Sequence, residues 1–478
     1  MKIKALSRSV SDYTRERVSG IHLLQSNPDP SIHPFERSRE YVRALNATKL
    51  EKLFAKPLIG AMDDHSDGVW CMARSPRSLT LFASGSADGE VRIWDLARQQ
   101  AVWTTYAHQG FVRGMTVSRD GRHLFTCGDD KTIKKWFFGR PTSSSMAAKD
   151  GAVRSDVSSA EVGALSFSGT YASRETAAEP LESWIGKNSL TRIDHSHGED
   201  RFITSGSTLE LWDYHRSQPI HSFTWGQSID TITTVAFNPA QHNVVASTAS
   251  DRSICLYDVR AKTAVRKVIL YLKTNSLAWN PQEPFNFATA NEDGNAYSFD
   301  MRKLSSALVV HKDHVGAVMD VSFSPTGRKI VTGSYDRTIR LWGARSGKSH
   351  QVYHTRRMQR VFCVEYSGDG RFVMSGSDDA NVRIWKANAS ESVARLAPRE
   401  RRKRNYEAKL KKRFAYTKEV RRIARHQHAP RIIKKDQRLE REANEREREK
   451  RKRRIAHSKP GTFKRKKTRE LPIVKELE

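Results

Sequence analysis

Apolar and polar residues alternate in short runs through the middle of the chain, and most runs follow a turn rich in Gly, Ser and Asp. Strict alternation over four to eight residues is typical of a half-buried β-strand. One version of this pattern recurs seven times, as a polar turn and then an alternating strand that ends in an aromatic residue. The closing aromatics are Trp94, Trp136, Trp212, Tyr257, Phe299, Trp342 and Trp385.

The spacing between these aromatics sets the size of the repeat. Five of the six intervals are 42 to 45 residues long, which is the period of a four-stranded propeller blade. The sixth is 76, because a Ser- and Ala-rich insertion occupies 141–189, where Ala164–Phe167 and Trp184–Ile185 are candidate strands. Residues 56–386 therefore resemble the WD40-repeat family. We predict an all-β propeller of seven blades, of which the third is the least regular.

A propeller closes its ring when a strand from the other end of the repeat region completes the last blade. The segment Lys56–Met62 lies directly before the first blade and is apolar enough to be a strand. We expect it to be the outer strand of blade seven.

Resemblance to WD40 repeats implies a structural network in each regular blade, made of a loop His, a strand Ser or Thr, a turn Asp and the closing Trp. A buried His or Asp needs such partners, because an unpaired polar group is costly to bury. Four blades keep all four residue types. The sets are His65, Ser84, Asp88 and Trp94; His108, Thr126, Asp130 and Trp136; His314, Thr332, Asp336 and Trp342; and His354, Ser375, Asp379 and Trp385.

The same sets contain the residue types of a hydrolase triad. Repetition at the blade period favours a structural role, because a nucleophilic site is needed only once. The four cysteines, at positions 71, 127, 255 and 363, lie far apart beside apolar runs, so we expect buried free thiols. The sequence predicts a protein that is not an enzyme and has no cofactor or metal site.

The N-terminal segment, 1–55, divides into a polar arm over 1–32 and a short helix within 33–57. Apolar residues recur near helical spacing in the second part. They are Tyr41, Leu45, Leu50, Leu53 and Phe54. We expect this helix to pack beside the propeller; a separate binding motif is the alternative.

The net charge of +30, from 83 Lys and Arg against 53 Asp and Glu, is unevenly distributed. Residues 386–478 carry 34 Lys and Arg against 13 Asp and Glu, a net charge of +21. A basic block of this size is typical of a chain that binds a polyanion. Nucleic acid is the first candidate, and an acidic protein or an anionic membrane is the alternative.

This basic region has two parts. Residues 387–435 predict two basic helices, each with a narrow apolar stripe, that end before Pro430. The stripes are Tyr406, Leu410 and Phe414, then Val420, Ile423 and Ala424. We expect the helices to dock on the propeller, to contact RNA through their basic face, or both. Residues 436–478 are almost wholly charged and predict a long solvated helix or a basic tail that orders on binding.

Twenty cations of this region are candidate RNA or phosphate contacts. They are Arg401, Arg402, Lys403, Arg404, Lys411, Lys412, Arg413, Arg421, Arg422, Arg425, Lys434, Lys435, Arg451, Lys452, Arg453, Arg454, Lys464, Arg465, Lys466 and Lys467. The clusters at 450–454 and 464–467 also fit nuclear import signals. On the propeller, the loop cations Arg356, Arg357 and Arg360 are candidates for a contact with RNA or an acidic peptide, with solvated surface charge as the alternative.

Segments outside the repeats resemble the Sof family of eukaryotic WD-repeat proteins. They are HPFERSREYVRALNATKLEKLFAKP before the first blade, and KRNYEAKLKKRF and RRIARHQHAPRIIKK in the basic region. The resemblance implies a C-terminal helical Sof-type domain and a place in the nucleolar U3 small nucleolar ribonucleoprotein and the small-subunit processome. It implies a scaffold required for processing pre-ribosomal RNA to 18S rRNA. Its partners would be pre-ribosomal RNA or U3 RNA and other processome proteins, in the nucleus and nucleolus.

A second function class is a substrate receptor of a cullin-RING ubiquitin ligase. Such receptors carry W-D-x-R at a blade end, and Tyr257–Arg260 and Phe299–Arg302 resemble it with Tyr or Phe in place of Trp. A chromatin or membrane-surface adaptor is a third class. No apolar run approaches the roughly 18–20 residues that span a bilayer, and the N-terminus lacks an apolar signal region. We expect a soluble intracellular protein with no membrane partner and no small-molecule substrate.

Overall fold

The computed structural model describes residues 35–138, 179–223, 231–261, 263–394, 396–459, 462 and 467–477. Contacts divide the chain into two compact units. The propeller unit contains residues 58–387 and 428–478, and the helical unit contains residues 1–57 and 388–427. The polar arm expected at 1–32 and most of the predicted insertion lie outside the described residues.

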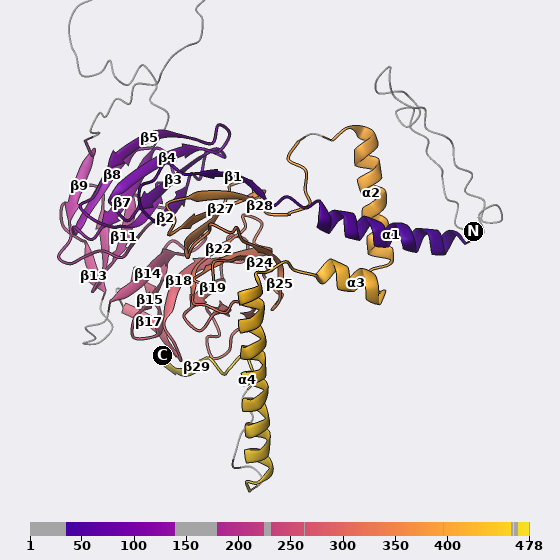
Figure 1. Ribbon diagram of the computed structural model, residues 1–478. Helices are drawn as coiled ribbons and strands as arrows, with labels where there is room; N and C mark the ends of the chain where they lie inside the picture. The colour runs from indigo at the N-terminus through magenta and orange to yellow at the C-terminus, as the bar shows by residue number, and fades with distance from the viewer. Residues whose placement is uncertain are drawn as a thin grey trace, which may run out of the picture. The chain divides into compact units, whose positions relative to one another are not determined.

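Seven antiparallel sheets form the propeller, which confirms the predicted fold (Figure 1). Blade one contains β2 (Val69–Arg74), β3 (Leu81–Ser86), β4 (Glu90–Asp95) and β5 (Gln100–Tyr106). Blade two contains β6 (Val112–Val117), β7 (His123–Gly128), β8 (Thr132–Phe137) and β9 (Glu182–Ile185). Blade three contains β10 (Arg192–His195), β11 (Arg201–Ser205), β12 (Leu209–Asp213) and β13 (His221–Phe223).

The other four blades follow in chain order. Blade four contains β14 (Ile232–Phe237), β15 (Val244–Ala249), β16 (Ser253–Asp258) and β17 (Thr263–Leu270), together with β29 (Ile473–Leu477). Blade five contains β18 (Thr274–Trp279), β19 (Asn286–Asn291), β20 (Asn295–Asp300) and β21 (Val309–Lys312). Blade six contains β22 (Val318–Phe323), β23 (Lys329–Ser334), β24 (Ile339–Gly343) and β25 (Ser349–Tyr353). Blade seven contains β26 (Val361–Tyr366), β27 (Phe372–Ser377), β28 (Val382–Lys386) and β1 (Leu58–Met62).

The long insertion falls inside blade two. Strand β9 pairs with β8, with Trp184 opposite Ile133, and Trp184 is buried. The expectation of a strand at Trp184–Ile185 is therefore confirmed, whereas Ala164–Phe167 lies outside the described residues. Because both flanking strands keep their places, the insertion leaves the four-stranded sheet intact.

Strand β1 closes the ring by pairing antiparallel with β28, as chain order predicts. Its ends lie opposite the ends of β28, with Leu58 across from Trp385 and Met62 across from Val382. In Figure 1 the indigo β1 lies beside the orange β28. Met62 is buried in an apolar cluster with residues of blades one and seven, so the closing strand also fills the core between them.

Apolar clusters between neighbouring blades make up the core. A blade has two faces, and each described cluster draws its side chains from two adjacent blades. The closing tryptophans Trp94, Trp212, Trp342 and Trp385 are among the largest fully buried side chains. All four cysteines are buried and unpaired, as the sequence predicts, and burial raises the pKa of the Cys71 thiol to about 12. A sheet that buries both faces needs this sandwich arrangement.

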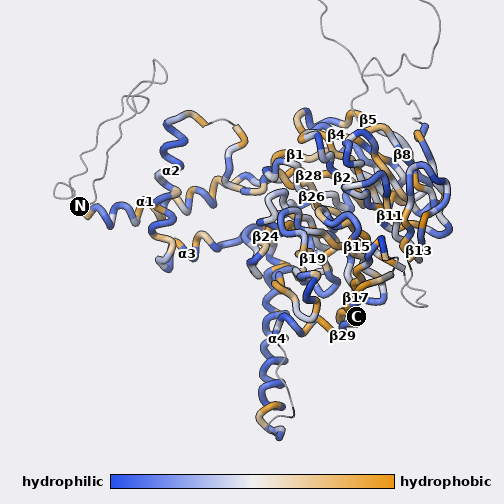
Figure 2. Tube along the Cα trace, turned by 180° about the vertical axis from the view of Figure 1, so that it is seen from behind, coloured by the Kyte–Doolittle hydropathy of each residue, from blue (hydrophilic) through white to orange (hydrophobic). Residues whose placement is uncertain are grey.

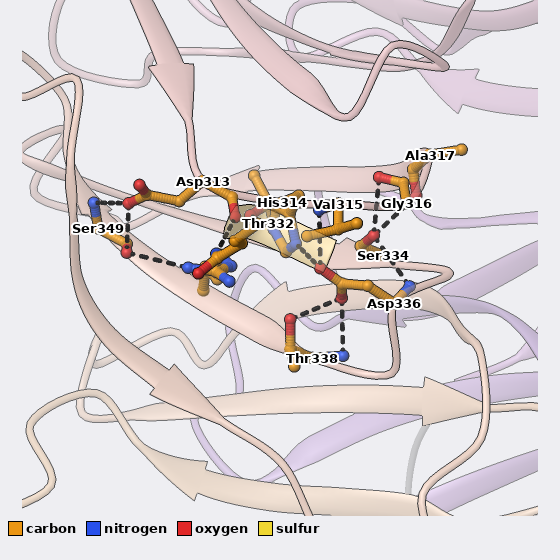
Figure 3. A network of polar contacts seen from close by, with 12 residues as sticks. Asp313, His314, Val315, Gly316, Ala317, Thr332, Ser334, Asp336, Thr338 and Ser349 are labelled. Atoms are coloured by element: carbon orange, nitrogen blue, oxygen red, sulfur yellow. Dashed lines mark hydrogen bonds and ion pairs between the residues drawn. The ribbon is translucent and has the colours of Figure 1, made fainter. Parts of the chain in front are cut away.

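The expected polar network is complete in blades two and six, and Figure 3 shows the surroundings of His314, Thr332 and Asp336 in blade six. In blade six the Trp342 indole donates to Thr332 Oγ1 at 2.8 Å, Thr332 lies 2.7 Å from His314 Nε2, and His314 Nδ1 lies 2.8 Å from Asp336. Burial lowers the pKa of His314, which favours a neutral ring that donates to the carboxylate and accepts from the hydroxyl. Blade two repeats the arrangement, with Trp136, Thr126, His108 and Asp130.

Blade one departs from the expected set at its acid. His65 Nε2 contacts Ser84 at 2.6 Å and Trp94 donates to the same hydroxyl, but His65 Nδ1 faces Glu90 at 3.2 Å. The expected partner, Asp88, accepts a hydrogen bond from Ser66 instead. The longer Glu side chain, two residues further on, replaces the turn Asp as the acceptor for the histidine.

Blade seven departs at its histidine. Trp385 donates to Ser375 at 2.8 Å, but Asp379 forms a two-pronged pair with Arg383. Asp379 thus pairs with Arg383, and in the described part of the chain no bond joins it to His354. His354 instead packs edge-on against His428, with ring centroids 5.6 Å apart. The expected tetrad is therefore not assembled in this blade.

Two further elements of the propeller unit come from the C-terminal region. Helix α4 (Arg431–Ala456) begins after Pro430, and Gln437 donates to the backbone oxygen of Asp313 at 2.6 Å. Strand β29 then pairs with β17, the edge strand of blade four, with Ile269 opposite Lys475. Sequence analysis treats 436–478 as a charged helix or tail and does not anticipate β29. The segment 473–477 of the C-terminal region is thus held on blade four by main-chain pairing and by the buried Ile473.

The helical unit contains α1 (Glu36–Leu53), α2 (Pro398–Arg413) and α3 (Lys418–Arg425). Helix α1 buries Ala44, Ala47 and Thr48, whereas Leu50, Leu53 and Phe54 are at least half exposed. The apolar stripe predicted for this helix is therefore wrong in its last turn. Small side chains form the buried face instead, and they allow α2 and α3 to approach closely.

Thr126→Val tests the polar network against a matched residue of blade three. The substitution leaves both His108 Nε2 and the Trp136 indole N–H without a partner, whereas Thr204→Val removes only the partner of Trp212. We expect Thr126→Val to lower the free energy of unfolding by about 3 kcal/mol and Thr204→Val by about half as much. Denaturant titration measures both values. Equal losses would show that the histidine adds nothing to the blade.

Ile473→Ala tests the anchoring of β29. Ile473 is 9% exposed and packs in the cluster of blades four and five, while Val474 is 59% exposed. We expect Ile473→Ala to cost about 2 kcal/mol and to speed hydrogen exchange at β17 amides. Val474→Ala should change neither measurement. Identical exchange in the two variants would contradict the assignment of β29.

Candidate nucleic-acid interface

The helical unit is built around a small apolar cluster. Leu410 and Phe414 of α2 and Val420 of α3 are buried with Ala44 of α1, and Tyr41 meets Phe414 edge-on at 5.9 Å. Pro398 starts α2 at a position where a missing N–H costs nothing. Three of the six predicted stripe residues, Leu410, Phe414 and Val420, thus form the core, whereas Tyr406 and Ala424 are exposed.

Two of the cations predicted to bind phosphate instead form ion pairs with acidic residues of α1. Lys411 pairs with Glu51 at 2.5 Å, and Arg413 pairs with Glu40 at 2.6 Å. The Tyr41 hydroxyl donates to Glu419 at 2.8 Å, which raises the pKa of the phenol. Lys411 and Arg413 therefore join α2 to α1, and the Tyr41–Glu419 bond joins α1 to α3. The sequence analysis missed these ion pairs, although the acidic residues of α1 that complement the two cations were visible in the sequence.

The remaining cations of α2 and α3 lie on the surface, where Figure 2 shows these helices as predominantly hydrophilic. The exposed ones among the predicted contacts are Arg401, Lys403, Arg404, Lys412, Arg421, Arg422 and Arg425. Lys403 reaches Glu407 one turn away at 4.0 Å, and such exposed pairs contribute little. Arg402 is half-buried and takes part in an interaction of its own.

Helix α4 is anchored at its start and exposed further along. Ala429 and Ile433 are buried and Gln437 bonds to Asp313, whereas residues 443–456 are all exposed. A helix of 26 residues is about 39 Å long. Its exposed predicted contacts are Lys434, Lys435, Arg451, Lys452, Arg453 and Arg454. None of these six forms an ion pair with another described residue, so α4 presents uncompensated positive charge to solvent.

The last predicted cluster is only partly described. Lys464, Arg465 and Lys466 lie outside the described residues. Lys467 is exposed, and its backbone N–H donates to Glu470 at 3.3 Å.

The propeller loop cations Arg356, Arg357 and Arg360 are all exposed. Arg360 lies over the Tyr335 ring at 5.2 Å, and its backbone oxygen accepts from the Asp378 N–H at 2.9 Å. Within the described part of the chain, neither Arg356 nor Arg357 has an acidic partner. The loop therefore offers positive charge next to an aromatic ring.

A cavity of about 490 Å³ opens between inner strands of the propeller. Its wall contains both signs of charge, including Arg74, Arg192, Asp194 and Glu365. Arg74 lies 3.4 Å from Glu365, and burial raises the pKa of that carboxyl to about 7. Because these charges compensate one another, the cavity does not match a simple anion or cation site.

The chain matches two protein families in different parts. The Sof1-like domain family matches residues 387–473, which extends past the boundary at 435 and ends at the start of β29. The WD domain, G-beta repeat family matches residues 56–95, 99–136, 217–258, 305–343 and 347–386. The unmatched stretches contain most of blades three and five, which lack the regular tetrad yet form complete sheets.

Full-length relatives decide the family. Protein SOF1 of Saccharomyces cerevisiae is 40% identical over 467 residues, covering 93% of this chain and 91% of the relative. DDB1- and CUL4-associated factor 13 is 44% identical in both Xenopus laevis and Homo sapiens, covering 97% of this chain and 96% of each relative. The chain belongs to the Sof1 family. Membership of this WD40 family, typically composed of non-catalytic scaffolds, agrees with a structural interpretation of the tetrads.

No helix of the described residues is both long and apolar enough to cross a membrane. The described part of this Sof1-family chain also has no group of three or more His, Cys, Asp or Glu residues placed to hold a metal ion.

Phe414→Ala tests whether the three helices form one cooperative unit. Phe414 is 3% exposed, and its loss should cost about 3 kcal/mol within the helical unit. We expect faster hydrogen exchange throughout α1, α2 and α3, with unchanged protection in the blades. Tyr416→Ala, at a residue 68% exposed, is the control and should change neither. Retained protection of α1 in the Phe414 variant would contradict this packing.

Proposed function

We propose that this Sof1-family chain is a non-enzymatic assembly factor of the small ribosomal subunit. It acts within the U3 ribonucleoprotein and the small-subunit processome, in the nucleolus, where pre-ribosomal RNA is processed to 18S rRNA. Two sets of cations, on α2 and α3 and on α4, bind pre-ribosomal or U3 RNA. The blades dock neighbouring proteins.

The observation that carries this proposal is the uncompensated charge of α4 in a chain of the Sof1 family. Arg451, Lys452, Arg453 and Arg454 are exposed and unpaired within the described residues. Cations neutralise phosphates and release counterions, which supplies most of the affinity of such contacts. Arginine can also contact a phosphate through two N–H groups or stack on an unpaired base. Family membership supports the ribosomal role, and the charges support RNA as the partner.

Charge removal on α4 tests the RNA contact without disturbing packing. Replacing Arg451, Lys452, Arg453 and Arg454 with Gln should reduce the salt dependence of single-stranded RNA binding by roughly 0.7 for each phosphate that is no longer neutralised, about 3 in all. A control variant replaces four exposed cations of the blades: Arg98, Arg122, Lys303 and Arg371. Anisotropy titrations at several salt concentrations give the slopes. Equal slopes for the two variants would move the RNA contact away from α4. Deleting 399–478 is a poorer test, because it also removes β29 and the partners of α1.

Crosslinking and sequencing of bound RNA tests the biological role. We expect enrichment of small-subunit precursor RNA and U3 RNA with the full chain, and a loss of that signal in the α4 variant. Signal spread over unrelated messengers would refute the assembly role.

A second candidate function follows from the names of several relatives and from one site. DDB1- and CUL4-associated factor 13 is named for association with a ubiquitin-ligase adaptor and scaffold. In the Phe299–Arg302 motif, Arg302 pairs with Asp300 at 2.9 Å and lies over Phe285 at 4.6 Å, with its side chain 64% exposed. Capture of DDB1 and CUL4 without pre-ribosomal proteins, abolished by Arg302→Ala, would favour the receptor function over the assembly role.

A further inference from the structure

The inner strands of the propeller share a local irregularity. Strands β2, β6, β10, β14, β18, β22 and β26 contact one another in a ring. In six of these seven, the pairing register shifts at the second residue, where one extra residue forms a β-bulge. Bulges turn a side chain away from the regular sheet. The residues at these bulges are Trp70, Arg113, Thr233, Asn275, Met319 and Phe362.

On one half of the ring these positions connect neighbouring blades. Thr191, just before β10, donates to the backbone oxygen of Ile232 at 2.6 Å. Thr233 donates to Thr274 O at 3.0 Å, and Asn275 donates to Val318 O at 2.8 Å. In blades three to five, the side chain at or beside the bulge therefore already bonds to the backbone of the next blade.

On the other half two of the bulge residues, Trp70 and Phe362, form a continuous aromatic row with the loop residues Phe111 and Tyr335. Trp70 lies 4.7 Å from Phe362 and 5.8 Å from Phe111, and Phe362 lies 6.1 Å from Tyr335, all between ring centroids. The row thus crosses blades six, seven, one and two. Phe111 is 37% exposed and Tyr335 is 38% exposed. The two ends of the row are therefore open to solvent.

Arginines lie on this aromatic row. Arg113 is 5.2 Å from the Trp70 centroid and 4.6 Å from the Phe111 centroid, and two bonds to Asp129 hold it there. Arg360 lies over Tyr335. Arg356 and Arg357 precede it on the same loop. Asp129 pairs with Arg113, and Asp378 contacts the Arg360 backbone, whereas Arg356 and Arg357 have no acidic partner within the described residues.

The faces of the central rings are already occupied. Trp70 packs against Phe362 of blade seven, and the Arg113 guanidinium of blade two lies over the Trp70 ring. A nucleobase needs a free ring face on which to stack. Prepacked aromatics with arginines at their margin instead match the composition of protein interface cores and hot spots. The row favours a partner that covers it with a side chain and brings negative charge to its rim.

We propose that the row Phe111, Trp70, Phe362 and Tyr335, with the rim of Arg113, Arg356, Arg357 and Arg360, is the docking site for an acidic segment of a partner protein that presents one apolar side chain. This rests on the proposed function, in which the blades dock neighbouring proteins, and it names the surface and the chemistry of the partner. Charge complementarity at the rim speeds encounter, and apolar contact supplies the affinity.

A random library of 12-residue peptides on phage, selected on the full-length chain, tests the proposal. Counter-selection uses the Phe111→Ala and Tyr335→Ala double variant, whose altered side chains are more than a third exposed and do not fill the core. We expect the selected sequences to be rich in Asp and Glu around one apolar residue. A synthetic peptide of that sequence should bind the double variant about tenfold more weakly. It should bind Arg356→Gln, Arg357→Gln more slowly, with a weaker salt dependence.

Tyr106→Ala, on the outer strand of blade one at a residue 72% exposed, is the matched control and should bind like the parent chain. Selected peptides that lack acids, or that bind the double variant equally well, would overturn the proposal. So would a loss of binding to a 12-nucleotide single-stranded RNA in the double variant equal to the loss in the α4 variant, because the row would then serve nucleobases. The peptide experiment does not depend on the RNA sequencing experiment. Its result can therefore be interpreted even if the ribosomal role is refuted.

Discussion

The pairing of β1 with β28 is the interaction on which the rest of the molecule depends. Each blade buries apolar side chains on both faces, so a chain of seven blades has two uncovered faces unless its ends meet. Strand β1 joins them across more than 320 residues of sequence and adds Met62 to the core between blades seven and one. The entropic cost of closing a loop grows only slowly with its length, whereas the apolar area that the closing strand covers is large.

The polar networks of the blades follow one rule, and the repeat pattern of the sequence shows only part of it. In each described case, a turn carboxylate finds a donor, but the donor differs from blade to blade. Histidine serves in blades two and six, Lys267 pairs with Asp251 in blade four, and Tyr297 donates to Asp293 in blade five. Burial of the carboxylate requires some donor, and any side chain that reaches it can meet the requirement. The tetrad pattern therefore predicted the networks of blades two and six, but not the partners that carboxylates find in the other blades.

Periodicity predicted the architecture because a blade is a local unit with a repeated signal. The closing aromatics placed every blade, and chain order placed β1. What could not be predicted depends on contacts distant in sequence. Strand β29 is five residues long in a charged context, and only the free edge of β17 makes it a strand. Likewise, the exposed cations of α4 were visible in the sequence, but the engagement of Lys411 and Arg413 by acids of α1 was not.

The helical unit has a consequence for the order of events during synthesis. Its first helix, α1, precedes the propeller, and its partners α2 and α3 follow it. At about 5–20 residues per second, tens of seconds separate the emergence of Ala44 from that of Leu410 and Phe414. Until then the buried face of α1 has nothing to cover it. The assembled helical unit therefore exists only on a chain that has been translated past its last blade, and a partner that recognises this unit distinguishes finished molecules from incomplete ones.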